Sequence, residues 1–369
     1  MQIFQTLSEM PDPRTGMNIV YPLRDIITLT FCAVLSQADS WDEIADFGRL
    51  NKKWLKHHFN ISKIPSHDTF RRFFLLLNKN VFEKYFISWI KDIWTHKSKH
   101  ISFDGKTSRR SFDNTKEIPA VHILNAFDGE NSLVLAQRKT GVKTNEISAI
   151  KEMLDMLDVG GAIITIDAIG TQKSIAEKII EKKADYVLSV KDNQKKLHEG
   201  IIDCFTKEYL PFMNGYDRFH EPEHKAHGRI EERTVQSYNI DQRIRKKLQL
   251  DEWANCKSII EINRKQLVNG QLSDEKQYYI SSVQVSAKDS AAMIRDHWNI
   301  ENKLHWTLDV VFREDDCRKR AGNTAENFSL IRKIAFNILT RKQVGRKRSL
   351  RAKRKAAAWS RSFLLGLLF

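Results

Sequence analysis

The feature that most constrains the fold of this chain is a short apolar run that ends in a carboxylate. Residues 161–167 read GAIITID, with β-branched side chains between a Gly-Gly pair and Gly170. Such a run predicts a strand buried on both faces, because a strand with one face in water alternates apolar with polar residues. Asp167 then lies at the carboxyl end of the strand, which is the edge where ligands bind in open α/β sheets.

Two further acids have comparable positions. Helical spacing over residues 171–184 and an apolar strand over 186–190 follow Asp167 and complete a β-α-β unit. Asp104 ends another short strand, and Glu301 lies within a long helical pattern in the last third of the chain. Whether these three acids converge in the fold decides whether they can form one site.

The order of the predicted elements indicates the fold class. Three strands, a helix and the β-α-β unit follow one another, at 101–104, 121–127, 133–138, 145–157 and 161–190. This β-β-β-α-β-α-β order is that of the ribonuclease H-like fold, which we use as an analogy. Later strand candidates lie at 233–238, 258–263 and 277–283. We predict an α/β protein with a ribonuclease H-like mixed-sheet core and a β-rich insertion, preceded by an all-helical N-terminal module.

Changes of pattern along the chain predict five segments. These are a helical N-terminal module (1–95), the first part of the core (96–209), a β-rich insertion (210–285), core helices that carry the third acid (286–340) and a basic C-terminal tail (341–369). In the first segment, helices are expected at 22–35, after Ser40, after Pro65 and at 81–94, whereas residues 1–20 are rich in turns. Ser40 and Glu43 have the spacing of a capping box.

The charge of the chain favours a polyanionic partner. The formal net charge is +15 and the pI is near 9.5, which indicates nucleic acid ahead of an acidic membrane. The longest uncharged apolar stretch, residues 26–35, is about half the roughly 20 residues of a membrane span, so we predict a buried helix and no membrane partner. Four scattered cysteines without a C-x-x-C pair predict neither zinc nor disulfides and fit a reducing cytoplasm.

Three converging carboxylates would make an oxygen-only site suited to two Mg²⁺ or Mn²⁺ ions. Such a pair of ions serves phosphodiester chemistry, which fits a strongly basic protein. Gly105 and Lys106 follow the first acid, where the lysine could hold a phosphate. A zinc alternative stays open, because His297, Glu301 and His305 share one helical face at i, i+4 and i+8.

Basic residues elsewhere suggest DNA contacts. Arg71 and Arg72 lie on a helix after a tight turn, which suits either a DNA reader or a solvated helix face. The C-terminal run that includes Arg348 and Arg351 predicts a DNA-contacting arm, with a solvated tail as the alternative. Trp298 and Trp306 could stack an unpaired base, although core packing is the commoner role.

Several motifs together resemble a known family. They are SWDEIADFG, IPSHDTFRRFF, FDGKTSR, TIDAIGTQ, DYVLSVKDNQ, HGRIEER and HWNIENKLHWTLDVVFREDDCRKR. In this order, from about residue 8 to near the C terminus, they look like the H repeat-associated proteins, bacterial insertion-sequence transposases of the DDE class and of the ISAs-type branch.

The resemblance implies a ribonuclease H-like core, DNA strand cleavage and strand transfer at element ends, and metal ions held by Asp104, Asp167 and Glu301. It further implies double-stranded DNA as partner, at terminal inverted repeats and target, with a homodimer on DNA in the bacterial cytoplasm and nucleoid. In the broader superfamily a tyrosine, an arginine and a lysine flank the glutamate, but here Ile294, His297 and Leu308 stand there. Phosphate contacts must therefore come from other side chains, for which we name His297, His305, Arg313, His227 and Arg229.

Two alternatives to a transposase remain at this point. One is a structure-directed DNA nuclease on the same core, which would cleave but not join strands. The other is a catalytically silent DNA-binding protein descended from a transposase, which would show no metal-dependent cleavage.

Overall fold

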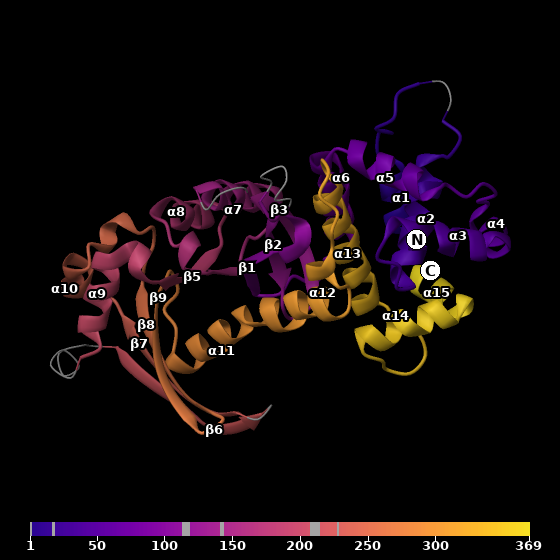
Figure 1. The fold of residues 1–369 in the computed structure, drawn as a ribbon. Helices are drawn as coiled ribbons and strands as arrows, with labels where there is room; N and C mark the ends of the chain where they lie inside the picture. The colour runs from indigo at the N-terminus through magenta and orange to yellow at the C-terminus, as the bar shows by residue number, and fades with distance from the viewer. Residues whose placement is uncertain (1, 17–18, 113–118, 141–143, 207–214, 227–228) are drawn as a thin grey trace.

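A single mixed sheet of nine strands forms in the part of the chain that the structure describes. The computed structural model describes residues 2–16, 19–112, 119–140, 144–206, 215–226 and 229–369. The strand order is β3-β2-β1-β4-β5-β9-β8-β7-β6 (Figure 1). The strands are β1 (His100–Thr107), β2 (His122–Asp128), β3 (Leu133–Thr140), β4 (Ile163–Ile166), β5 (Asp185–Val190), β6 (Tyr216–Ala226), β7 (Arg229–Asn239), β8 (Ser258–Val268) and β9 (Gln271–Ser281).

The pairing of the strands confirms the predicted mixed sheet. β1 pairs in parallel with β4 and β4 with β5, whereas the remaining neighbours are antiparallel. The segment predicted as a β-rich insertion contributes β6 to β9, and because β9 pairs with β5, these strands extend the same sheet. The protein is therefore an α/β protein with a large, mostly antiparallel sheet.

Helices cover both faces of the sheet around β4. Alternate side chains of a strand point to opposite faces. Thr165 contacts His297 of α11 (Ala287–His297), and Ile166 belongs to the buried core with Ile150 of α7 (Thr144–Met156) and Ile175 of α8 (Lys173–Glu181). In Figure 1, α7 and α8 lie on one side of these strands and α11 on the other. Two shorter helices, α9 (Lys195–Cys204) and α10 (Gln242–Lys247), accompany the extended sheet.

The N-terminal segment forms six helices. They are α1 (Gln2–Ser8), α2 (Leu23–Leu35), α3 (Trp41–Leu50), α4 (Lys52–Phe59), α5 (His67–Leu76) and α6 (Lys79–Ile93). The predicted capping box is present, since Ser40 accepts a hydrogen bond from the Glu43 amide and Glu43 from the Ser40 amide. The sequence did not predict α1 or α4. α1 lies in a stretch read as turn-rich, although Ile3 and Leu7, four residues apart, are both fully buried.

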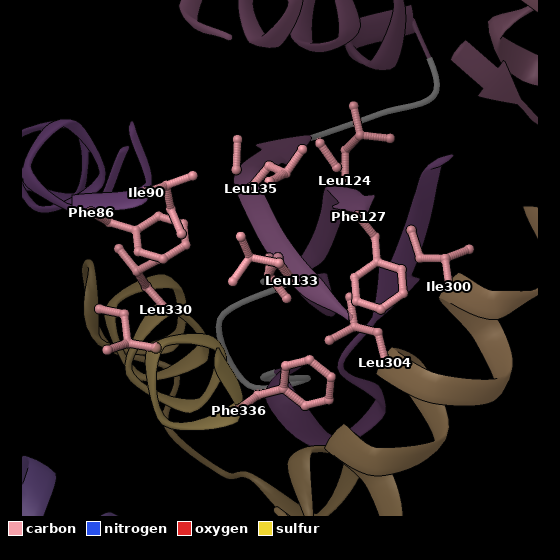
Figure 2. Close-up of a cluster of buried hydrophobic side chains, with 14 of the residues drawn as sticks. Phe86, Ile90, Leu124, Phe127, Leu133, Leu135, Ile300, Leu304, Leu330 and Phe336 are labelled. Carbon is pink, nitrogen blue, oxygen red and sulfur yellow. The ribbon is translucent and has the colours of Figure 1, made fainter. Parts of the chain in front are cut away.

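The helix α13 (Thr324–Arg341) joins the sheet to the N-terminal helices. Residues 324–339 are all buried, and Asn337 makes hydrogen bonds of 2.9 Å to the backbone of Val134 in β3. On another side of α13, Asn327 donates to the carbonyl oxygens of Phe74 and Leu77. Figure 2 shows Leu330 and Phe336 of this helix among side chains of α6, β2 and β3.

The predicted basic tail is wrong, because the C-terminal residues fold. They form α14 (Leu350–Trp359) and α15 (Arg361–Leu368), which pack against each other and against α2 and α13. Lys353 and Arg354 are buried rather than solvated. Both chain ends therefore build one structure, which we call the helical lobe (α1–α5, α14 and α15). Within the described ranges, no helix is both long and apolar enough to cross a membrane.

Candidate active site

The register of two parallel strands places Asp104 beside Asp167. Phe103 of β1 pairs with Ile166 of β4, and each aspartate is the next residue along its chain. Neighbouring strands lie about 4.8 Å apart, so the two backbones hold these acids side by side. Each carboxylate accepts a hydrogen bond from the following amide, at 2.8 Å from Gly105 and 2.5 Å from Ala168. Asp167 follows β4 directly, as predicted, whereas Asp104 lies within β1, which continues to Thr107. The parallel register of the two strands, rather than a shared strand end, therefore places the acids side by side.

Glu301 reaches the same edge of the sheet from a helix. α11 lies across β1 and β4, and the helix continues through a π-helical turn (Ile300–His305) into α12 (Trp306–Val310). Ile300 and Leu304 in this turn are fully buried, and Figure 2 shows both near Phe127 of β2. π-helical turns insert a residue into an α-helix and occur frequently at functional sites. This one anchors the helix next to β1, where it carries Glu301.

The three carboxylates affect one another electrostatically. Burial raises the pKa of Asp104 to about 7, and the charges of Glu301 and, more weakly, Asp167 add to the rise. Burial and the charge of Asp167 also raise the pKa of Glu301. The structure therefore brings together the three acids that the sequence singled out, in an arrangement that disfavours three full negative charges.

The donor set of this cluster suits Mg²⁺ or Mn²⁺, which prefer oxygen ligands, and a cation would relieve the repulsion. Among the residues that the structure describes, no three His, Cys, Asp or Glu side chains lie close enough to hold a metal ion as placed. Coordination by Asp104, Asp167 and Glu301 would require their side chains to rotate inward.

Two partly buried histidines lie beside these acids. His305 Nδ1 is 3.5 Å from Asp104 Oδ2, and its Nε2 is 3.3 Å from Asn125 Nδ2 on β2. His297 Nδ1 is 2.9 Å from Thr165 Oγ1. Burial lowers the pKa of His297 to about 4 and that of His305 to about 3, so both rings are neutral near pH 7. The two rings thus have separate partners, Thr165 for His297 and the Asp104 carboxylate for His305, which does not favour the zinc alternative.

Two lysines differ from the expectation for this site. Lys106, proposed to hold a phosphate, places Nζ 2.6 Å from Asp309 and 3.3 Å from Asp315, and only 9% of its side chain is exposed. Lys191 was missed, although it directly follows β5 as Asp167 follows β4. Its Nζ is 3.7 Å from Asp167 Oδ1. The motif DYVLSVKDNQ carried the signal, because it is an apolar strand that ends in a charged side chain.

Three of the other predicted DNA-binding residues, Arg71, Arg72 and Arg351, are exposed arginines on helices α5 and α14. Arg71 and Arg72 both pair with Asp68 on the exposed face of α5. The guanidinium of Arg348 lies 5.1 Å from the centre of the Phe363 ring, and Arg351 is exposed on α14. Arg313 is exposed after α12. His227 lies outside the described residues, and Arg229 begins β7.

A cleft of about 780 Å³ borders Glu301 on the side of the extended sheet. Trp298 and Asn302 line it from the helix, and Arg233 of β7 and Arg264 of β8 line it from the sheet. Trp298 is therefore not a core residue, and Trp306 is 56% exposed. The cleft therefore leaves Glu301 accessible to a large ligand.

Comparison with known sequences assigns the family. The family described as "Transposase DDE domain" matches residues 92–338, and the family described as "DDE_Tnp_1-associated" matches residues 4–90. The chain belongs to the bacterial DDE transposases. This transposase is 39% identical to "H repeat-associated putative transposase YhhI" of Escherichia coli (strain K12), across 100% of this chain and 97% of that protein. It is 41% identical to "Putative transposase YncI" of Escherichia coli O157:H7, across 90% and 86% of the two chains.

A solved structure of another transposase is also similar. It is the piggyBac transposase synaptic complex with hairpin DNA, at 14% identity and a TM-score of 0.46, with 100% of this chain and 79% of that chain covered. The likeness is too weak to assign a fold.

Proposed function

We propose that this DDE transposase cleaves and joins DNA strands at the ends of an insertion sequence, with Asp104, Asp167 and Glu301 as the metal-binding catalytic residues. The observation that carries the proposal is the register of β1 and β4. It sets two acids side by side, and the helix through Glu301 crosses the same strands. The strand order β3-β2-β1-β4-β5 further supports a ribonuclease H-like core, in which acids meet at this edge.

Different side chains have different roles at this site. The three carboxylates supply oxygen ligands for two Mg²⁺ or Mn²⁺ ions. The chemistry gained from such ions is activation of the attacking oxygen and stabilisation of the leaving oxygen of a phosphodiester. His305 Nδ1 lies 3.5 Å from the carboxylate of Asp104, and Lys191 adds a positive charge beside Asp167 that can attract a phosphate.

The surface of the protein offers positions for double-stranded DNA. Exposed arginines on α5 and α14 suit the backbone of an inverted repeat, and the cleft beside Glu301 suits the strand that is cut. Arg233 and Arg264 in that cleft can neutralise phosphates, and Trp298 can stack on an unpaired base. The protein would thus act on the bacterial chromosome and its mobile elements, in the cytoplasm.

The proposal is tested with Asp104→Asn, Asp167→Asn and Glu301→Gln, which keep the shape of each side chain and remove its charge. On duplex DNA with the inverted repeats that flank the gene, each variant should lose at least about a thousandfold in cleavage rate, because metal binding needs the charge. DNA affinity should stay close to that of the wild type.

The control is Asp158→Asn. Asp158 is 74% exposed, pairs with Lys97 and precedes β4 at the opposite end of that strand. It should cleave as the wild type does. Full activity in any one of the three test variants refutes the assignment of that acid. Joined products distinguish a transposase from a nuclease, and cleavage of any kind that depends on metal excludes a silent DNA-binding protein.

A further inference from the structure

A second cleft, of about 560 Å³, lies between the start of α3 and the segment 313–321 that follows α12. The cleft therefore lies between the helical lobe and the segment that follows the helix of Glu301. Six cations line it, and we call it the arginine cleft: Arg71, Arg313, Arg318, Lys319, Arg320 and Arg332. None of the residues proposed for catalysis lines it.

The acids in the arginine cleft are already engaged. Asp39 Oδ1 lies 3.3 Å from a guanidinium nitrogen of Arg354, and Glu43 accepts the amides that cap α3. The other two acids have partners as well, Asp42 with His67 and Asp316 with Arg110 and Arg313. Asp39 also interacts electrostatically with Arg332. Nevertheless, six cations against four acids in its lining leave the cleft with a net positive charge.

Two of these cations keep an unpaired donor. Arg332 is only 2% exposed, and its Nε has no hydrogen-bond partner; the Nε of Arg320 is also buried without one. An unpaired buried donor costs about 1–3 kcal/mol, and it commonly marks the place of an ion or ligand. The Phe328 ring, 4.6 Å from the guanidinium carbon, fixes the orientation of Arg332.

The remaining charges show that the cleft favours an anion. Lys319 Nζ lies 3.7 Å from the centre of the Phe328 ring and 4.8 Å from that of Trp41, and burial lowers its pKa to about 8. Burial alone would raise the pKa of the Cys317 thiol, but the charges of Arg332 and Lys319 lower it. The cations of the cleft therefore favour negative charge at the position of Cys317.

We propose that the arginine cleft binds a phosphate group of the DNA backbone between the helical lobe and the helix of Glu301. Guanidinium groups form forked hydrogen bonds to phosphate oxygens, which would satisfy Arg320 and Arg332. That the ligand is DNA rests on the proposed function, because free phosphate offers the same oxygen atoms to the guanidinium groups. A DNA end held in this cleft is held by the same segment that leads from Glu301 to α13.

The test compares the salt dependence of DNA binding in Arg320→Gln and wild type, on a duplex with the flanking inverted repeats. Loss of one phosphate contact should reduce the slope of log K against log salt by about 0.9. Arg318 is exposed at the rim of the cleft, so Arg318→Gln should also reduce the slope of log K against log salt, and it leaves the buried groups unchanged. Lys182→Gln is the control, because Lys182 pairs with Asp155 beside α8, on the other face of the sheet. It should keep the slope of the wild type.

An unchanged slope in both Arg320→Gln and Arg318→Gln overturns the proposal. Inorganic phosphate provides a second arm. If it raises the Tm of the wild type above that in chloride of equal ionic strength, while both variants keep the wild-type DNA slope, the cleft binds free phosphate and the DNA assignment is wrong. These experiments measure DNA binding and stability, not cleavage. If the protein binds DNA but does not cleave it, they therefore still test the proposal for the arginine cleft. If the protein cleaves DNA and the slopes of the variants are unchanged, the proposal for the arginine cleft is wrong and the proposed function stands.

Discussion

Asp104 is less exposed than Asp167: 17% of its side chain is exposed, against 51% for Asp167. The neighbouring β2 and the π-helical turn cover it, and Asn125 and His305 lie within hydrogen-bonding range of its backbone and side chain. A buried carboxylate beside two others is unfavourable unless it is protonated or bound to a cation. In the absence of a cation, the charged form of Asp104 therefore destabilises the folded protein, at the residue where we expect a metal ion.

This destabilisation predicts a pH dependence of stability in metal-free protein. The pKa of Asp104 rises from 3.8 to about 7 on folding, so the folded state binds the proton more tightly. Protonation of Asp104 therefore contributes fully to the free energy of unfolding below pH 3.8, and this contribution is lost as the pH rises through about 7. Each pH unit corresponds to about 1.4 kcal/mol, so the total loss is at most about 4 kcal/mol.

Urea unfolding of Asp104→Asn in a chelating buffer checks this expectation. The variant should equal or exceed the wild type in stability at pH 8, and its advantage should shrink at pH 5. Added Mg²⁺ should stabilise the wild type at pH 8 and have a smaller effect on the variant. An advantage that is the same at both pH values would contradict the burial of a charged Asp104.

The sequence predicted the acids but not their partners. Asp104 and Asp167 each follow an apolar run, and that local pattern singled both out. However, β1 continues past Asp104 to Thr107, so it is the parallel register of β1 and β4 that places the two acids side by side. The contact of Asn125 with Asp104 depends on the register of β1 against β2, and that of His305 depends on the π-helical turn. Neither leaves a mark in the local sequence, because both arise from packing between distant segments.

At the scale of the element, α14 shows why composition misled the reading of the C terminus. Nine cations between residues 341 and 355 are typical of a solvated tail. Lys353 instead donates to the carbonyl oxygens of Leu339 and Lys342, at 2.6 and 2.7 Å, where α13 ends. Cations commonly stabilise the carbonyl end of a helix in this way. Lys353 and its neighbour Arg354 are buried, and Arg341 and Lys342 also donate to the distant backbone carbonyls of Ile93 and Phe369. Several of the nine cations are therefore structural, and only the tertiary contacts reveal which ones.

Arg354 is one of these structural cations, and its removal should be severe. Its guanidinium donates to the carbonyl oxygens of Val34 and Val311 and lies 4.4 Å from the centre of the Phe312 ring. Arg354→Ala leaves buried acceptors and Asp39 without a partner, which should reduce the free energy of unfolding by about 3 kcal/mol or more. Denaturant unfolding measures the loss.

The adjacent Lys355→Ala serves as a matched control. Lys355 is exposed on the same helix, so its replacement should change stability by no more than about 0.5 kcal/mol. Equal effects of the two substitutions would show that α14 is not anchored by Arg354. For the same reason, deletion of the chain from Gly345 onward should unfold the helical lobe rather than simply weaken DNA binding.

At the scale of the whole molecule, the two chain ends share one core. Phe59 of α4 stacks on Phe369 at 6.0 Å, and the guanidinium of Arg361 lies 5.0 Å from the centre of the Phe47 ring. The sequence showed the helices of the first segment one by one, because each has its own apolar period. It could not show that the last helices complete their core, or that β9 joins β5, since such pairings depend on shape and register rather than on local pattern.

This shared core shapes the prediction about assembly. Joining two element ends requires two active sites at a fixed spacing, and two-fold symmetry is the commonest way for one polypeptide to supply them. We propose that the protein acts as a dimer on paired ends. One protomer would bind an end through its helical lobe, and the other would cut that end. A protein with its N-terminal helices deleted is unsuitable for a test, because α13 to α15 pack on those helices.

Full-length variants with separate defects test the dimer instead. Glu301→Gln keeps the exposed Arg71 and Arg72 but should not cleave, whereas Arg71→Gln with Arg72→Gln should lose end binding and keep its carboxylates. Each protein should be inactive alone, and their mixture should restore cleavage at one end, because the intact sites then lie on different protomers. Asp158→Asn in place of Glu301→Gln is the control and should be active without a partner. If no ratio of the two defective proteins restores cleavage, and the DNA complex has the mass of a single protomer, the protein acts as a monomer and the dimer proposal is wrong.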